Sequence, residues 1–142
     1  MGDAQDVAAD IAAMANTRGG ILIYGVKETR TTSGASEICH VAITDAAMRA
    51  FRSKLYARLN PTVAGLVIQC FPPSATEGFL VVQIPESPDA PHVVGTKKSL
   101  GVPYRVGTQT EWMSEWEIER AYRDRFARCV TDSAHLDEAS PH

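Results

Sequence analysis

The stretch ANTRGGILIYGV, residues 15–26, joins a polar segment and a glycine pair to a run of aliphatic side chains. Apolar residues recur at helical spacing just before it, which predicts a helix over residues 6–16. Gly19 or Gly20 supplies the left-handed residue that ends many helices. The run at 21–26 is β-branched and aromatic without polar alternation, which predicts a strand buried on both faces.

The glycine pair raises the question of a phosphate-binding loop. Such a loop places its glycines before a helix, where free amides and the positive end of the helix dipole lie. Gly19 and Gly20 instead follow a helix and precede a strand, so the nearer helix end is the negative one. The chain also contains no GxxxxGK[ST] motif. The order of elements therefore favours a helix end over a phosphate loop.

The middle of the chain alternates helical and extended patterns. Residues 45–59 carry an apolar stripe at helical spacing and are followed by a proline, which predicts a second helix. The apolar segments 63–71 and 79–85 flank a turn, which predicts two antiparallel strands. HVV (92–94) and PYRV (103–106) flank a lysine-containing turn and are predicted to form a second hairpin.

The third predicted helix has the clearest start. In SEWE, residues 114–117, the Ser hydroxyl and the Glu carboxylate can each bind a free amide of the first turn, which is a capping box. The polar residues 27–37 are predicted to be a loop, and residues 131–142 a flexible acidic tail after a single domain of residues 1–130. This pattern predicts an α+β fold, with three helices on a mixed, largely antiparallel sheet.

The charge of the chain limits the kinds of partner it can bind. The formal net charge is −3, from 14 basic and 17 acidic residues. Three of the acidic residues lie in 131–142, together with no Lys or Arg, so residues 1–130 carry 14 charges of each sign. A nucleic-acid-binding surface would therefore have to be local.

Cysteine usage and the first residues indicate the compartment. Cys39, Cys70 and Cys129 are odd in number and far apart, which argues against a disulfide framework and a zinc site. The acidic start MGDAQDVAAD is unlike a secretory signal, and the longest apolar runs are too short to span a bilayer. We expect a protein of the reducing cytoplasm with no membrane partner.

Taken together, the motifs resemble the Alba-type domain of Schlafen proteins and of many bacterial proteins thought to bind DNA. That family has a helix ending in Ala-Asn-Thr-x-Gly-Gly and an apolar strand ending in Gly-Val. The matching residues here are Ala15, Asn16, Thr17, Gly19, Gly20, Gly25 and Val26. PESPDAPH resembles a further family segment through Pro85, Ser87, Pro91 and His92. YRVGTQTEWMSEWEI resembles the last strand and helix through Arg105, Gly107, Thr108, Thr110, Ser114, Glu117 and Ile118.

The chain departs from the family pattern at its start. The resemblance covers about residues 7–130, but family members begin with a strand that carries acidic residues and a Glu/Asp-x-Lys pattern ahead of the first helix. Residues 2–6, GDAQD, do not resemble such a strand. We therefore expect the first strand to be missing and a sheet edge to be exposed. Since exposed edges pair with other chains, a homodimer is a reasonable hypothesis.

The resemblance implies binding of DNA or RNA, as a module of a regulatory or defence protein. Phosphate contacts require several basic residues on one surface, because the gain comes from released counterions. The candidate contact residues fall into two groups along the chain. They are Arg18, Lys27 and Arg30 beside the first motif strand, and Lys97, Lys98 and Arg105 on the second predicted hairpin.

Two alternative functions remain open. Some Schlafen proteins carry in this domain a metal-dependent ribonuclease with three carboxylates, and Glu28 is placed where the third would lie. Mg²⁺ or Mn²⁺ would be needed only in that case, and a solvated loop residue beside Lys27 is the favoured interpretation of Glu28. The second alternative is a module that binds only protein.

Two histidines and two tryptophans are expected to have structural roles. His40 and His92 lack partners at metal-ligand spacing and are expected at the surface or at a sheet edge. Trp112 and Trp116 flank the start of the third helix and are expected to anchor it by packing, with stacking on bases as the alternative.

Overall fold

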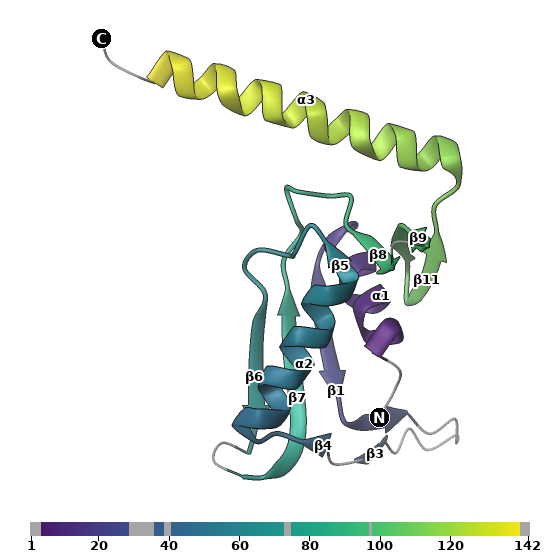
Figure 1. The fold of residues 1–142 in the computed structure, drawn as a ribbon, viewed down its shortest axis with the longest axis vertical. Helices are drawn as coiled ribbons and strands as arrows, with labels where there is room; N and C mark the ends of the chain where they lie inside the picture. The colour runs from purple at the N-terminus through teal and green to yellow at the C-terminus, as the bar shows by residue number, and fades with distance from the viewer. Residues whose placement is uncertain (1–3, 29–35, 39–40, 73–74, 97, 140–142) are drawn as a thin grey trace.

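The computed structural model describes residues 4–28, 36–38, 41–72, 75–96 and 98–139 (Figure 1). The helices are α1 (Ala4–Ala15), α2 (Asp45–Arg58) and α3 (Glu115–Ala139). The first strands are β1 (Gly20–Tyr24), β2 (Val26–Glu28), β3 (Ser36–Ile38), β4 (Val41–Ala42), β5 (Leu59–Asn60) and β6 (Val67–Phe71). The others are β7 (Glu77–Ile84), β8 (Val93–Thr96), β9 (Ser99–Gly101), β10 (Pro103–Val106) and β11 (Gln109–Trp112). The predicted α+β class is confirmed.

The main sheet is built around β7. This strand pairs antiparallel with β1, β4 and β6, and its register with β6 runs from Phe71 opposite Phe79 to Val67 opposite Gln83. The predicted antiparallel pair is therefore confirmed, although β6 begins four residues later than expected because Gly65 adopts a left-handed turn. Three smaller antiparallel sheets, β2–β3, β10–β11 and β5–β8–β9, complete the described part of the fold.

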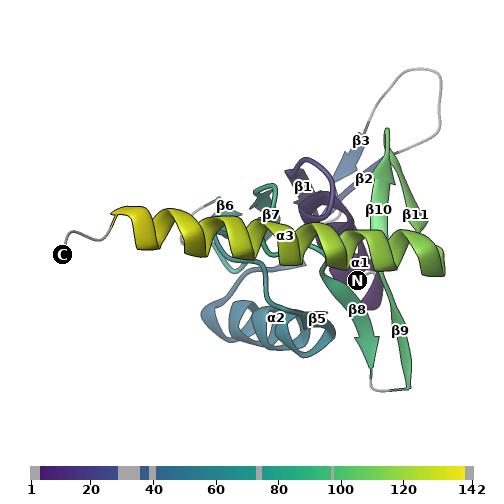
Figure 2. The same cartoon turned by 90° about the horizontal axis from the view of Figure 1, so that it is seen from above.

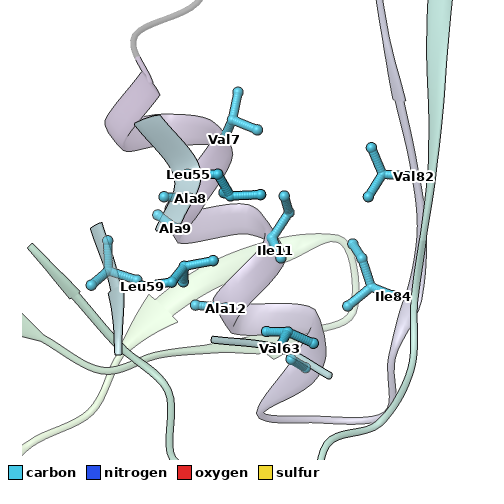
Figure 3. Close-up of a cluster of buried hydrophobic side chains, with 12 residues drawn as sticks. Val7, Ala8, Ala9, Ile11, Ala12, Leu55, Leu59, Val63, Val82 and Ile84 are labelled. Carbon is cyan, nitrogen blue, oxygen red and sulfur yellow. The ribbon is translucent and has the colours of Figure 1, made fainter. Parts of the chain in front are cut away.

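The hydrophobic core lies between the main sheet and two helices (Figures 1 and 3). Ile11 of α1 is fully buried between Leu59, which follows α2, and the β7 residues Val82 and Ile84. Helix α1 is rich in alanine on this side, and the small side chains let the helix approach its neighbours closely. Thr44 caps α2 through a hydrogen bond from the Ala47 amide (3.2 Å).

Strand β1 is not buried on both faces, so that prediction was wrong. Ile21 and Ile23 are 62% and 51% exposed. Both helices of the core cover the opposite face of the sheet, and β1 pairs only with β7 among the described strands. An aliphatic run without polar alternation is thus compatible with a strand that leaves one apolar face in solvent.

The second predicted hairpin also has a different pairing. β8 pairs with β9, and β10 pairs with β11, so PYRV faces QTEW instead of HVV. Gly107, with φ of 62°, forms the turn between β10 and β11. The predicted loop at 27–37 contributes residues to β2 and β3 at its two ends, which pair with each other. The segment from β8 to β11 contains two turns, one at Lys98 and one at Gly107, and the sequence pattern did not decide which strands each turn joins.

Helix α3 starts at its predicted cap and continues further than expected. The Glu117 carboxylate accepts the Ser114 amide at 2.9 Å, which is one half of the predicted capping box. The helix then runs to Ala139, through residues for which we predicted an irregular tail. No proline or glycine interrupts the chain before Pro141, and Thr131 donates to the Ala127 carbonyl at 3.0 Å. No helix in the described residues is long and apolar enough to cross a membrane.

Candidate nucleic-acid interface

The C-terminal end of α1 is tied to two distant segments by Asn16. Its Nδ2 donates to the carbonyls of His92 (3.1 Å) and Pro103 (2.8 Å). Its Oδ1 accepts the His92 amide at 2.7 Å. The amide of Ser87 donates to the Ala15 carbonyl at 3.0 Å beside it. The motif segments around residues 16, 87–92 and 103–105 therefore meet at one place in the fold.

His92 is fully buried here, which corrects its expected position at the surface or at an edge. Its Nδ1 lies 2.7 Å from the Pro61 carbonyl and its Nε2 lies 2.6 Å from the Ser87 hydroxyl. A carbonyl only accepts, so Nδ1 carries the proton and Nε2 accepts from Ser87. Burial lowers the pKa of His92, and the Pro61 hydrogen bond and the charge of Asp89 oppose that effect only in part. The neutral ring therefore serves as a structural link.

Thr17 and Arg105 connect α1 to β10. The Thr17 hydroxyl donates to the Ala13 carbonyl (2.9 Å) and accepts the Arg105 amide (2.9 Å). The Arg105 guanidinium donates to the Thr108 carbonyl (2.6 Å) and lies 3.6 Å from Asp10. Its side chain is 17% exposed, and its Nε is buried without a hydrogen-bond partner. Arg105 therefore holds the β10–β11 turn against α1, and much of its charge is already engaged.

A groove of about 760 Å³ opens between the start of β1 and the β10–β11 turn. Its lining residues are Met14, Thr17, Arg18, Gly19, Gly20, Ile21, Arg105, Gly107 and Thr108. Arg18 is exposed and makes no hydrogen bond or ion pair with the residues that the structure describes. The structure thus brings together two of the predicted basic residues, Arg18 and Arg105, and leaves the Arg18 guanidinium available to a ligand.

Gly19 shapes one wall of this groove. Its φ of 75° lies in the left-handed region, and its amide donates to the Met14 carbonyl at 2.7 Å, which ends the helix as predicted. A Cβ at this position would lie 2.5 Å from the Ile84 carbonyl oxygen. Gly19 is therefore required by the backbone at the helix end, as the order of elements indicated.

The other predicted contact residues do not join this groove. Lys98 is exposed in the turn between β8 and β9, and that hairpin points in the opposite direction from the β10–β11 hairpin (Figure 2). The backbone of Lys27 and Glu28 lies in β2. Arg30, Lys97 and His40 lie outside the described residues. The structure therefore places Arg18 of the first predicted group beside Arg105 of the second, and Lys98 of the second group on a different hairpin.

The metal-dependent ribonuclease alternative stays a hypothesis. Within the described ranges, no group of three or more His, Cys, Asp or Glu side chains could hold a metal ion. Glu28 follows the Gly-Val pair on β2, where the resemblance places a carboxylate. Its role in metal binding stays a prediction.

The contacts of three residues at the α1 junction were not predicted from the sequence. Ser87 and His92 are 6% and 0% exposed and bind each other, and Asp10 accepts from the Thr110 hydroxyl at 3.3 Å. The only available signal was that Ser87 and His92 lie in a segment that resembles a family motif. Spacing alone carries no information about these contacts, because Asn16 and His92 are 76 residues apart.

Comparison with known proteins identifies the family. The model of the family described as Schlafen, AlbA_2 matches residues 1–114, which is most of the chain. No curated protein and no solved structure matches the chain. The matched segment contains the whole junction of Asn16, Ser87, His92 and Arg105. The chain belongs to the Schlafen, AlbA_2 family.

Proposed function

We propose that the chain binds nucleic acid through phosphate contacts in the groove between β1 and the β10–β11 turn. The observation that carries the proposal is the position of Arg18, which lines the groove, is exposed and has no partner among the described residues. Membership of the Schlafen, AlbA_2 family supports a nucleic-acid-related domain. The proposed ligand is the sugar-phosphate backbone of DNA or RNA.

The expected binding is sequence-independent and sensitive to salt. Each phosphate neutralised by a basic side chain releases counterions, so the affinity falls as salt rises. Arg18 supplies a free guanidinium, while Arg105 contributes positive potential that Asp10 partly neutralises. A binding site with so few free charges has a shallow salt dependence compared with strongly basic DNA-binding proteins.

The test is a fluorescence-anisotropy titration with labelled RNA and DNA over a salt series. Arg18→Ala is expected to weaken binding and to reduce the slope of log K against log salt by about 1. Arg49→Ala is the matched control, because Arg49 is exposed on α2, away from the groove. An Arg18→Ala protein that binds with unchanged affinity and slope would contradict the proposal.

Pairing with a second copy is supported by a separate observation. β1 pairs only with β7 among the described strands, and its exposed face carries Ile21 and Ile23 without a proline or a charged side chain. Sedimentation over a range of concentrations tests this function, and Ile23→Lys is expected to shift the equilibrium towards monomer. A native protein that stays monomeric at the highest concentration would refute it.

A further inference from the structure

Helix α3 carries an unassigned surface outside the segment that the family model matches. The match ends at residue 114, and α3 begins at Glu115. The helix lies across the end of the body where β1 begins (Figures 1 and 2). Arg125 donates to the Asp89 carbonyl at 3.0 Å, and Arg128 donates to the Ala90 carbonyl at 3.1 Å. These bonds hold one side of α3 near the body and leave another side open.

The open side presents aromatic rings to solvent. Tyr122 and Phe126 are four residues apart on the helix, and their side chains are 39% and 73% exposed. The guanidinium of Arg125 lies 4.8 Å from the centre of the Tyr122 ring. A shallow depression between side chains of α3 follows this side of the helix. It is lined by Glu119, Tyr122, Arg123, Arg125, Phe126 and Cys129.

The same part of α3 is strongly basic. Residues 120–128 contain four arginines and one aspartate, which gives a net charge of +3 in a chain whose total charge is −3. Arg125 and Arg128 bind carbonyls of the body, and Arg123 forms an ion pair with Glu119 (2.6 Å) that is exposed on both sides. Exposed ion pairs of this kind contribute little to stability, so the Arg123 guanidinium can leave Glu119 for a phosphate group. Arg120 is also exposed.

We infer that this face of α3, defined by Tyr122, Phe126, Arg123 and Arg125, binds single-stranded nucleic acid. Unpaired bases stack on the two rings, and the arginines contact the adjoining phosphates, which is the usual combination in single-strand binding. Duplex bases are already stacked and cannot use the rings. A second copy of the chain is the alternative occupant of this face, and the test below distinguishes the two.

The opposite side of α3, which faces the body, lies against the α1 junction. Arg120 and Asn16 line one small cavity of about 230 Å³, and Arg18 follows Asn16 by two residues. The inference rests on the proposed function, since it specifies single-stranded nucleic acid as the ligand class.

The test uses the full chain and three labelled ligands: a short oligouridylate, an abasic strand of the same length, and a DNA duplex. Phe126→Leu removes the ring but keeps an apolar side chain, and Phe126→Trp keeps a ring. Phe126→Leu is expected to weaken oligouridylate binding about tenfold or more. It should leave the abasic strand and the duplex unaffected, and Phe126→Trp should restore binding. Because Phe126 is 73% exposed, the variants retain the fold, which melting temperatures verify.

The outcomes separate the α3 face from the groove. Arg18→Ala weakens single strands and duplex alike, whereas Phe126→Leu weakens only strands that carry bases. Equal affinity of native and Phe126→Leu protein for oligouridylate overturns the inference and leaves the groove proposal to its own test. Loss of self-association in Phe126→Leu, with unchanged oligouridylate binding, overturns it in favour of a second copy as the occupant.

Discussion

Replacing Asn16 by alanine removes three hydrogen bonds at once from the junction of α1 with its two distant segments. They are the bonds to the His92 and Pro103 carbonyls and from the His92 amide, at 3.1, 2.8 and 2.7 Å. A typical hydrogen bond contributes about 1 kcal/mol net, so the loss amounts to about 3 kcal/mol of unfolding free energy. For a domain of this size that corresponds to a fall in melting temperature of about 10 °C.

Asn16→Asp is the matched variant, because it keeps the shape and one accepting oxygen. Its second oxygen would face the carbonyls of His92 and Pro103, which only accept, so the aspartate is expected to be at least as destabilising as alanine at neutral pH. Protonation of the carboxyl would restore one donor and narrow the deficit in acid. Urea unfolding of the three proteins at two pH values measures both effects. A loss below about 1 kcal/mol for Asn16→Ala would show that water replaces these bonds and that the junction is not a structural centre.

Three other predictions test separate parts of the structure. Because the pKa of His92 is lowered in the folded state, the stability that its neutral ring contributes is fully present above the ordinary pKa of about 6.5 and falls as the pH drops below it. Melting curves between neutral and mildly acidic pH should therefore show a smaller fall in melting temperature for His92→Asn than for the native protein. Gly19→Ala should destabilise the protein more than Gly107→Ala. Both glycines have positive φ, which costs about 1–2 kcal/mol for alanine, but only the Cβ at position 19 meets a carbonyl oxygen at 2.5 Å, and the Cβ at position 107 meets nothing within 4 Å. Similar denaturation midpoints for the two variants would disprove this reason. Lys97→Ala with Lys98→Ala should weaken binding equally for all sequences and flatten the salt slope if this hairpin contacts phosphates, and an unchanged titration removes it from the interface.

Local signals in the sequence predicted the ends of elements well. The Glu117 carboxylate caps the start of α3 through one half of the expected capping box, and Gly19 provides the left-handed residue after α1. Each of these signals acts over a few residues, so the local sequence alone determines where the helix begins or ends. The α+β class followed from the same local patterns.

Pairing and burial were harder to predict because they depend on distant segments. HVV and PYRV each have turn residues on both sides, so their partners depended on the fold as a whole. The apolar run of β1 has one open face, since both core helices pack on the other side of the sheet. Of the basic residues, Arg18 and Arg105 meet in one groove although they are 87 positions apart, while Lys98 lies on another hairpin.

The junction at Asn16 also has a consequence for the order of folding. Its bonds close loops of 76 and 87 residues, and such closure costs chain entropy before any contact can offset it. The helices and the β6–β7 hairpin involve neighbouring residues and form at less cost. Asn16 is therefore expected to gain its partners after the folding transition state. Replacing Asn16 should then raise the unfolding rate far more than it lowers the folding rate, so the junction contributes to the kinetic stability of the folded domain.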